Sequence, residues 1–202
     1  MSTIKTNQLA HTANGASVYT LPTTDGSAGQ VLKTDGSGNL SWTTPSQGIS
    51  MIDSWRLTAD TGNGVNNLIS NWAAATNLLA SSLGSALSYS SGTGTFSFPS
   101  TGHYLMTFVC RFHCSSGNDS ELNVELKITE NNSSYSVAAH TAYGAQEGST
   151  KSDGTIIHAF DITDISNQKF QFHTDSMGST SQLRGNSTVN ETYFQVIRLG
   201  DT

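Results

Sequence analysis

The 202-residue sequence predicts an all-β protein made of a short extended N-terminal segment and an antiparallel β-sandwich. First, only 12% of the residues are charged and 19 are glycine, a composition unlike that of a helical enzyme. Second, residues 1–48 contain few large apolar side chains and several turn signals. Third, short apolar segments follow one another between turn clusters from residue 50 onward, which is typical of a sandwich.

The N-terminal segment repeats itself. Thr-Asp-Gly-Ser occurs at residues 24–27 and again at 34–37, and the second copy predicts a hairpin that turns at 35–38. An isolated hairpin is marginally stable in water, so this segment needs partner surfaces. Two identical chains or a different protein could supply them. The apolar residues expected to form this anchor are Leu21, Val31, Leu32, Leu40 and Trp42.

A linker around Gly48 divides this anchoring segment, residues 1–48, from a globular domain, residues 49–202. Within 65–83 no strand pattern is clear, and the Trp-Ala-Ala-Ala run at 72–75 leaves a helical turn open. The strands expected in the globular domain are 51–58, 85–89, 94–98, 103–113, 121–130, 135–143, 154–162, 168–174 and 191–199.

Two kinds of strand are expected. Residues 121–129 alternate apolar and polar side chains, which indicates a sheet with one face in water. Residues 104–112, 155–162 and 193–199 are apolar on both faces, and a two-layer sandwich covers only one. The second face therefore predicts an oligomer packed sheet to sheet, although the sequence does not say which face is core and which is interface. The residues assigned jointly to core and interface are Tyr104, Met106, Phe108, Phe112, Ile156, Phe160, Tyr193, Phe194, Val196 and Ile197.

Charge and motif content favour a non-enzymatic protein. The formal net charge is −6 and no basic run is present, which argues against nucleic-acid binding. No apolar secretory signal and no run of membrane-spanning length occur, so synthesis in a cytoplasm is expected. Catalytic motifs and phosphate loops are not found, and no cofactor is expected.

Histidine and cysteine positions allow further chemistry, but a structural role is favoured for both. His140, His158 and His173 fall on expected strands, where polar side chains on strand faces are more common than a metal site on a trimer axis. Cys110 and Cys114 would lie on one side of a strand about 13 Å apart, too far for a disulfide. They are expected to be buried apolar residues.

Three segments carry a resemblance to a known fold family. "FSFPSTGHYLMTFVCRF" (96–112), "KFQFHT" (169–174) and "NETYFQVIRL" (190–199) resemble the jelly roll of complement globular heads and tumour necrosis factor. The resemblance extends over about residues 50–200 and implies a homotrimer closed around the inner sheets.

The leader "MSTIKTNQLAHTANGASVYTLPTTDGSAGQVLKTDGSGNLSW" is similar to those of phage virion proteins, especially fibre-type appendages of marine and cyanobacterial phages. This resemblance implies a trimeric virion appendage with a C-terminal knob, anchored to another virion protein of the capsid or tail through residues 1–48. The favoured hypothesis is that the knob contacts a glycan or protein of the host surface. The alternative is a capsid decoration, cement or head-fibre protein with a purely structural role. Tail or capsid location, host and receptor stay open.

Strand parity predicts where recognition would occur. Loops 115–120, 144–153 and 176–190 are expected at the end of the knob opposite the linker, and exposed loops on a rigid scaffold commonly carry binding sites. Solvated connections are the alternative interpretation. The candidate recognition residues are Asn118, Asp119, Glu147, Lys151, Asp153, Asp175, Arg184 and Asn186.

Overall fold

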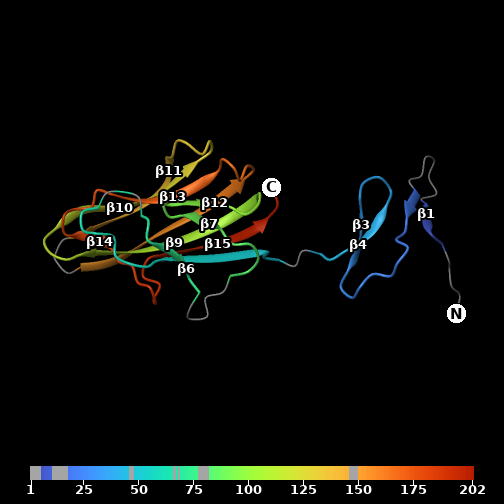
Figure 1. The fold of residues 1–202 in the computed structure, drawn as a ribbon, viewed down its shortest axis with the longest axis horizontal. Helices are drawn as coiled ribbons and strands as arrows, with labels where there is room; N and C mark the ends of the chain where they lie inside the picture. The colour runs from blue at the N-terminus through green and yellow to red at the C-terminus, as the bar shows by residue number, and fades with distance from the viewer. Residues whose placement is uncertain are drawn as a thin grey trace. The chain divides into compact units, whose positions relative to one another are not determined.

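The computed structural model divides the chain into two units, Met1–Gln47 and Gly48–Thr202, which we call the leader and the knob (Figure 1). This division lies one residue before the boundary expected from the sequence. Among the described residues, no helix is long and apolar enough to cross a membrane. The residues that the structure describes are 6–10, 18–45, 48–65, 67, 69–76, 82–145 and 150–202.

The leader contains two hairpins. β1 (Gln8–Ala10) pairs antiparallel with β2 (Val18–Thr20), and β3 (Val31–Thr34) pairs antiparallel with β4 (Leu40–Thr43). The β3–β4 turn is the one predicted from the second Thr-Asp-Gly-Ser copy. There the Asp35 carboxylate accepts hydrogen bonds from the side-chain amide of Asn39 and from the backbone N–H groups of Ser37 and Asn39. These bonds, the side-chain amide of Asn39 first among them, lower the pKa of Asp35.

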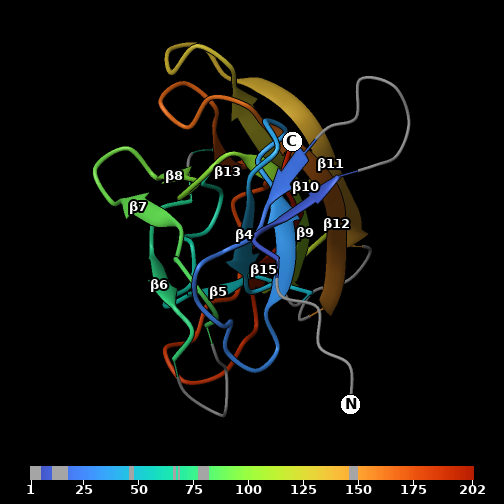
Figure 2. The same ribbon diagram turned by 90° about the vertical axis from the view of Figure 1, so that its right-hand side faces the viewer.

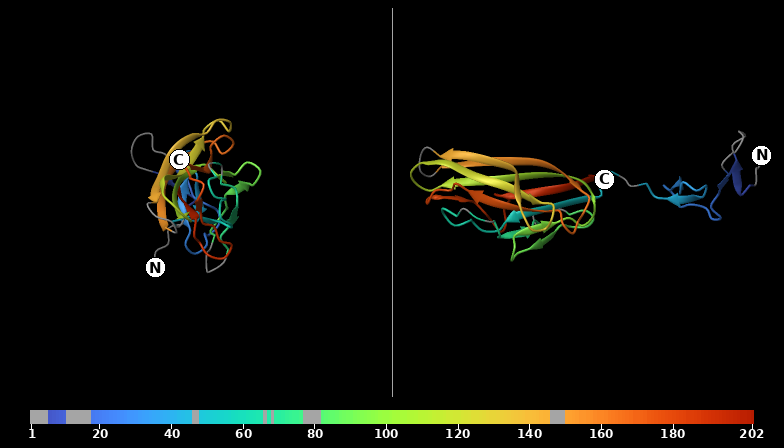
Figure 3. Two further views of the ribbon diagram at one scale, coloured as in Figure 1. Left: turned by 90° about the vertical axis from the view of Figure 1, so that its left-hand side faces the viewer. Right: turned by 90° about the horizontal axis from the view of Figure 1, so that it is seen from above.

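The knob is a sandwich of two antiparallel sheets, seen as separate layers in Figure 2 and Figure 3. The five-stranded sheet has the order β11-β10-β13-β8-β7, and the six-stranded sheet has the order β12-β9-β15-β5-β6 with β14 added beside β9. The first sheet consists of β7 (Ser88–Ser90), β8 (Thr95–Ser97), β10 (Asp119–Thr129), β11 (Ser136–Ala145) and β13 (Lys169–Asp175). The second consists of β5 (Met51–Leu57), β6 (Trp72–Ala74), β9 (Gly102–Cys114), β12 (Thr150–Ile162), β14 (Ser181–Leu183) and β15 (Tyr193–Gly200).

Each strand expected in the globular domain overlaps one of these strands, with differences at three places. The segment left open as a helical turn is strand β6, which pairs with β5. The loop expected at 144–153 is shorter, because β11 continues to Ala145 and β12 begins at Thr150. The loop expected at 176–190 contains β14, which pairs with the end of β9.

Aromatic rings join the two sheets in the core. Phe108 of β9 stacks on Phe172 of β13 with ring centroids 4.4 Å apart, and Phe96 of β8 meets Phe194 of β15 edge-on at 4.9 Å. Trp72 contacts several of these rings, and its indole N–H donates to the carbonyl of Ile69 at 3.0 Å. Offset and edge-to-face ring contacts add to the free energy gained from burial.

The structure shows which face of the two-faced strands forms the core. The buried side of the six-stranded sheet holds eight of the ten residues assigned jointly to core and interface, whereas Tyr193 and Ile197 lie on its opposite side. Cys110 and Cys114 are free and buried on the core side, as expected, and burial raises the pKa of the Cys110 thiol. The eight core residues are Tyr104, Met106, Phe108, Phe112, Ile156, Phe160, Phe194 and Val196.

Candidate assembly face and distal loops

The side of the six-stranded sheet that faces away from the core carries apolar residues, and the described part of the chain places no second sheet over it. We call it the open face, and its apolar members are Ile52, Leu105, Val109, Ile157, Ala159, Tyr193, Ile197 and Leu199. Strand register aligns four of them in one row, Ile52, Ile197, Leu105 and Ala159, across β5, β15, β9 and β12. Ile157 is 67% exposed and Leu199 is 57% exposed.

The next two rows are more polar. In the first of these rows, Gln195 of β15 lies between Ser54 of β5 and Thr107 of β9. Ile157 of β12 lies opposite Thr107 and completes the row. One step further, Tyr193 lies opposite Val109. The apolar character of the open face is therefore strongest near the end at which β5 begins.

Side-chain pairs between neighbouring strands occupy the two ends of the open face. His103 and Asp161 lie 3.7 Å apart near the start of β9. Toward the other end, Arg111 Nε donates to Asp153 at 2.9 Å and Nη2 at 3.2 Å, a two-bond pair between β9 and β12. This hydrogen bonding lowers the pKa of Asp153 and raises that of Arg111. The open face thus combines a row of apolar side chains with polar pairs toward both ends, a distribution that resembles a protein–protein interface.

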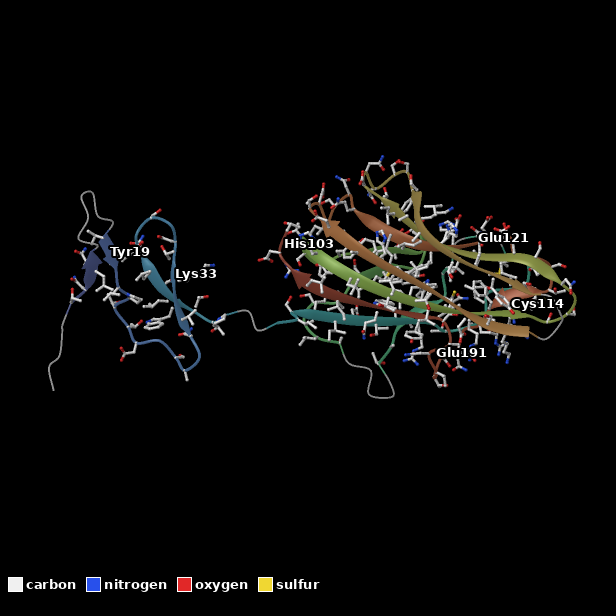
Figure 4. The ribbon with its side chains drawn as sticks, turned by 180° about the vertical axis from the view of Figure 1, so that it is seen from behind. Tyr19, Lys33, His103, Cys114, Glu121 and Glu191 are labelled. Atoms are coloured by element: carbon white, nitrogen blue, oxygen red, sulfur yellow. The ribbon has the colours of Figure 1, made fainter. Side chains whose placement is uncertain are left out.

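Three loops meet at the end of the knob reached by β9. We call them the distal loops: 58–65, 115–118 and 176–180, with β14 beside them. Their backbones are joined by hydrogen bonds from Thr61 to Leu183 at 3.0 Å, from Gly64 to Ser181 at 2.9 Å and from Ser115 to Thr180 at 2.9 Å. In Figure 4, Cys114 and Glu121 lie at this end of the knob and His103 lies at the opposite end. The topology therefore gathers these loops on one end, as strand parity predicted for 115–120 and 176–190.

The candidate recognition residues divide by environment. Asn118, Lys151 and Asp175 are exposed. Asp119 is only 8% exposed, and its carboxylate accepts the N–H of Gly178 at 2.7 Å. Its assignment as an exposed recognition residue is wrong, because the carboxylate is buried where it joins the start of β10 to the loop 176–180.

Two further candidates are held by contacts within the knob. Arg184 Nη1 donates to Asp60 at 2.6 Å, and its Nε lies 3.6 Å from Glu191. Asn186 accepts the backbone N–H groups of Thr188 and Val189 through its side-chain oxygen. Asp153 pairs with Arg111 as described above, and Glu147 lies outside the described residues.

The three strand histidines do not converge within one chain. His140 and His173 flank Glu125 on the outer face of the five-stranded sheet, whereas His158 lies on β12 against Phe160 with ring centroids 4.7 Å apart. Burial lowers the pKa of His158, and burial together with Lys127 lowers that of His173. Within the described part of the chain, no group of three or more His, Cys, Asp or Glu side chains could hold a metal ion.

The apolar residues of the leader are mostly exposed. Val31, Leu32 and Trp42 are 48%, 42% and 37% exposed, while Leu21 and Leu40 are half-buried. The indole of Trp42 lies under Gly26, where a Cβ would come within 2.5 Å of the ring, and its N–H donates to the carbonyl of Thr24 at 2.8 Å. The first Thr-Asp-Gly-Ser copy thus covers Trp42, whereas the second copy forms a hairpin turn.

Sequence reasoning missed part of the open face. Ile52 and the Arg111–Asp153 pair were not assigned to it, because their membership depends on which strands become neighbours. β5 and β15 come from opposite ends of the globular domain, so no local pattern joins them. Parity alone placed Leu105, Val109 and Ile157 on one side of their strands, but it could not tell which side was the core.

Comparison with known proteins identifies the fold. No protein-family model matches the sequence, and no curated protein matches it. Among solved structures, Eiger TNF from S. frugiperda is similar with a TM-score of 0.55 and 11% identity, covering 77% of this chain and 96% of that chain. Murine APRIL at pH 5.0 has a TM-score of 0.48 and 8% identity, covering 74% of this chain and 98% of that one. The similarity to Eiger establishes that the chain carries a jelly-roll β-sandwich of the tumour necrosis factor type.

Proposed function

We propose that this chain is a non-enzymatic structural module that assembles as a homotrimer through the open face of the knob. The observation that carries the proposal is the apolar row of this face formed by Ile52, Ile197, Leu105 and Ala159. Ile157, in the neighbouring row, is 67% exposed in the single chain. Each large apolar side chain contributes roughly 1.5–3 kcal/mol when it is fully buried. A contiguous apolar patch of this kind marks an interaction site in a soluble protein.

Threefold rather than twofold symmetry is favoured by the tumour necrosis factor type of jelly roll. Sedimentation equilibrium of the intact chain tests the proposal directly. We expect a single species of three times the 21.4 kDa chain mass at micromolar concentration. A stable monomer under these conditions would contradict the proposal.

We further propose that the trimer is a virion appendage, with the leader as its anchor and with the distal loops toward the host surface. The resemblance of residues 1–43 to phage virion leaders supports the location. The backbone bonds that fix the distal loops on the sandwich support a contact role, since recognition commonly uses loops on a rigid scaffold. A chain that lacks residues 1–48 should fold and trimerise, yet fail to join virions.

The second candidate is a capsid decoration, cement or head-fibre role without host contact. It is favoured by the internal bonding of Asp119 and Arg184, which leaves fewer polar groups of the distal loops free for a receptor. Replacing Asn118 and Asp175, which are exposed, separates the two functions. Reduced adsorption with normal particle stability supports host contact, whereas unchanged adsorption supports the structural role.

A further inference from the structure

The leader is ordered into paired strands but has no core of its own. None of its described residues, 6–10 and 18–45, is buried where burial is assigned. Its backbone is nevertheless fixed by specific bonds: Thr20 N–H donates to Gly38 at 2.8 Å, and Leu21 N–H donates to Asn7 at 3.0 Å. Hydrogen bonds that are open to water add little net stability, and two-stranded hairpins are marginal alone. The paired state therefore requires a covering layer.

Each hairpin carries an apolar cross-strand pair on one face. In β3–β4, Leu32 lies directly opposite Trp42, and Leu40 follows on the same side because side chains alternate along a strand. The other side of this hairpin carries Lys33 opposite Ser41, and Val31 opposite Thr43.

In the β1–β2 hairpin, Leu9 lies opposite Tyr19, and these side chains are 50% and 39% exposed. Ala10 lies opposite Val18 on its other face. Figure 4 labels Tyr19 and Lys33 on the two hairpins of the leader. The larger apolar side chains thus form two cross-strand pairs, Leu32–Trp42 and Leu9–Tyr19, with Leu40 beside the first.

We infer that this covering layer is formed by the leaders of the two other chains, so that residues 8–10 and 18–43 build a three-chain stem with Leu32, Trp42 and Tyr19 turned inward. The inference rests on the homotrimer proposed above. In a trimeric knob, three leaders are tethered to one assembly through residues 44–50. Joining binding segments through only a few residues gives them an effective concentration on the order of millimolar.

The charge of the leader also permits identical partners. The leader carries Lys5, Lys33, Asp25 and Asp35, so its charged side chains sum to 2 − 2 = 0. Three copies can therefore approach without like-charge repulsion, whereas the full chain carries −6. Around a threefold axis every copy presents the same surface, so apolar pair meets apolar pair.

Hydrogen–deuterium exchange of the full-length chain tests the inference, with the amides of β3 and β4 as the readout. In the wild-type trimer we expect these amides to exchange more slowly than those of an unstructured peptide. Leu32→Asp should raise their exchange to the unstructured rate while the knob stays trimeric. Ser41→Asp is the matched control, since it adds the same charge to the opposite side of the same hairpin and should leave protection unchanged.

A variant that disrupts the knob interface, Ile197→Asp, should lose leader protection together with the trimer. Unprotected β3 and β4 amides in a wild-type trimer would overturn the stem and leave the trimeric knob standing. This result would assign the covering layer to another protein. Equal effects of Leu32→Asp and Ser41→Asp would also overturn it, and so would leader protection that persists in a monomer.

Discussion

Val196 and Ile197 are neighbours on β15 whose side chains lie on opposite sides of the six-stranded sheet. Val196 is fully buried opposite Met106, whereas Ile197 lies on the open face opposite Leu105. Two adjacent residues thus have different roles: Val196 packs in the core of one chain, and Ile197 is proposed to contact a neighbouring chain.

This pair separates folding from assembly. Val196→Asp should unfold the knob, because it places an unpaired charge among buried aromatic residues. Ile197→Asp should leave a folded chain that sediments as a monomer. Circular dichroism and sedimentation of both variants measure the two effects, and the proposed assembly face is wrong if the Ile197 variant remains a trimer.

The tie between Asp119 and Gly178 should contribute to stability. Asp119→Ala removes the acceptor of the Gly178 N–H at 2.7 Å, and we expect a loss of about 1–3 kcal/mol in the free energy of unfolding. The exposed neighbour Asn118 is the control, and Asn118→Ala should change the free energy by less than about 0.5 kcal/mol. Urea unfolding measures both values, and similar losses would argue against a tie.

Burial of His158 should make the knob less stable in mild acid. Its pKa is lowered in the folded state, so the unfolded chain binds more protons as pH falls through the ordinary histidine range. The free energy of unfolding should therefore decrease from pH 7.5 to pH 5.5. His158→Asn should reduce this slope in urea titrations at several pH values. A slope that the substitution does not change would remove His158 as its source.

The contact between Gly26 and Trp42 should tolerate no side chain. Gly26→Ala would place a Cβ within 2.5 Å of the indole and displace the ring or the 24–27 segment. We expect the hydrogen–deuterium exchange of the Trp42 amide to increase while knob stability stays constant. Gly29→Ala is a less informative control because Gly29 has a φ of 86°. Gly92→Ala is preferable, since a Cβ there meets nothing within 4 Å.

Sequence periodicity predicted the strands and their two sides well, because alternation depends only on local geometry. It could not choose the core side of β15, since Val196 and Ile197 are both large and apolar. That choice depends on the five-stranded sheet, which packs over Val196. β14 was missed because three residues carry no periodic signal and its pairing with Cys114 is long-range.

The distal loops show a similar limit. Asp119 looked like an exposed loop residue because it lies in a run of Ser, Gly and Asn. Its burial depends on Gly178, which is far away in the sequence and leaves room for the carboxylate. Polarity therefore predicted a loop correctly but did not predict which of its polar groups would be exposed.

The register of β5 and β15 has a practical consequence. Met51, where the first knob strand begins, lies opposite Arg198, close to the last residue of the chain. Entry and exit of the knob are therefore adjacent, while the distal loops project from the other end. A peptide grafted between Ser115 and Asn118 would point away from any tag or surface attached at the first or the last residue of the knob. This arrangement suits the knob as a display scaffold with a defined orientation.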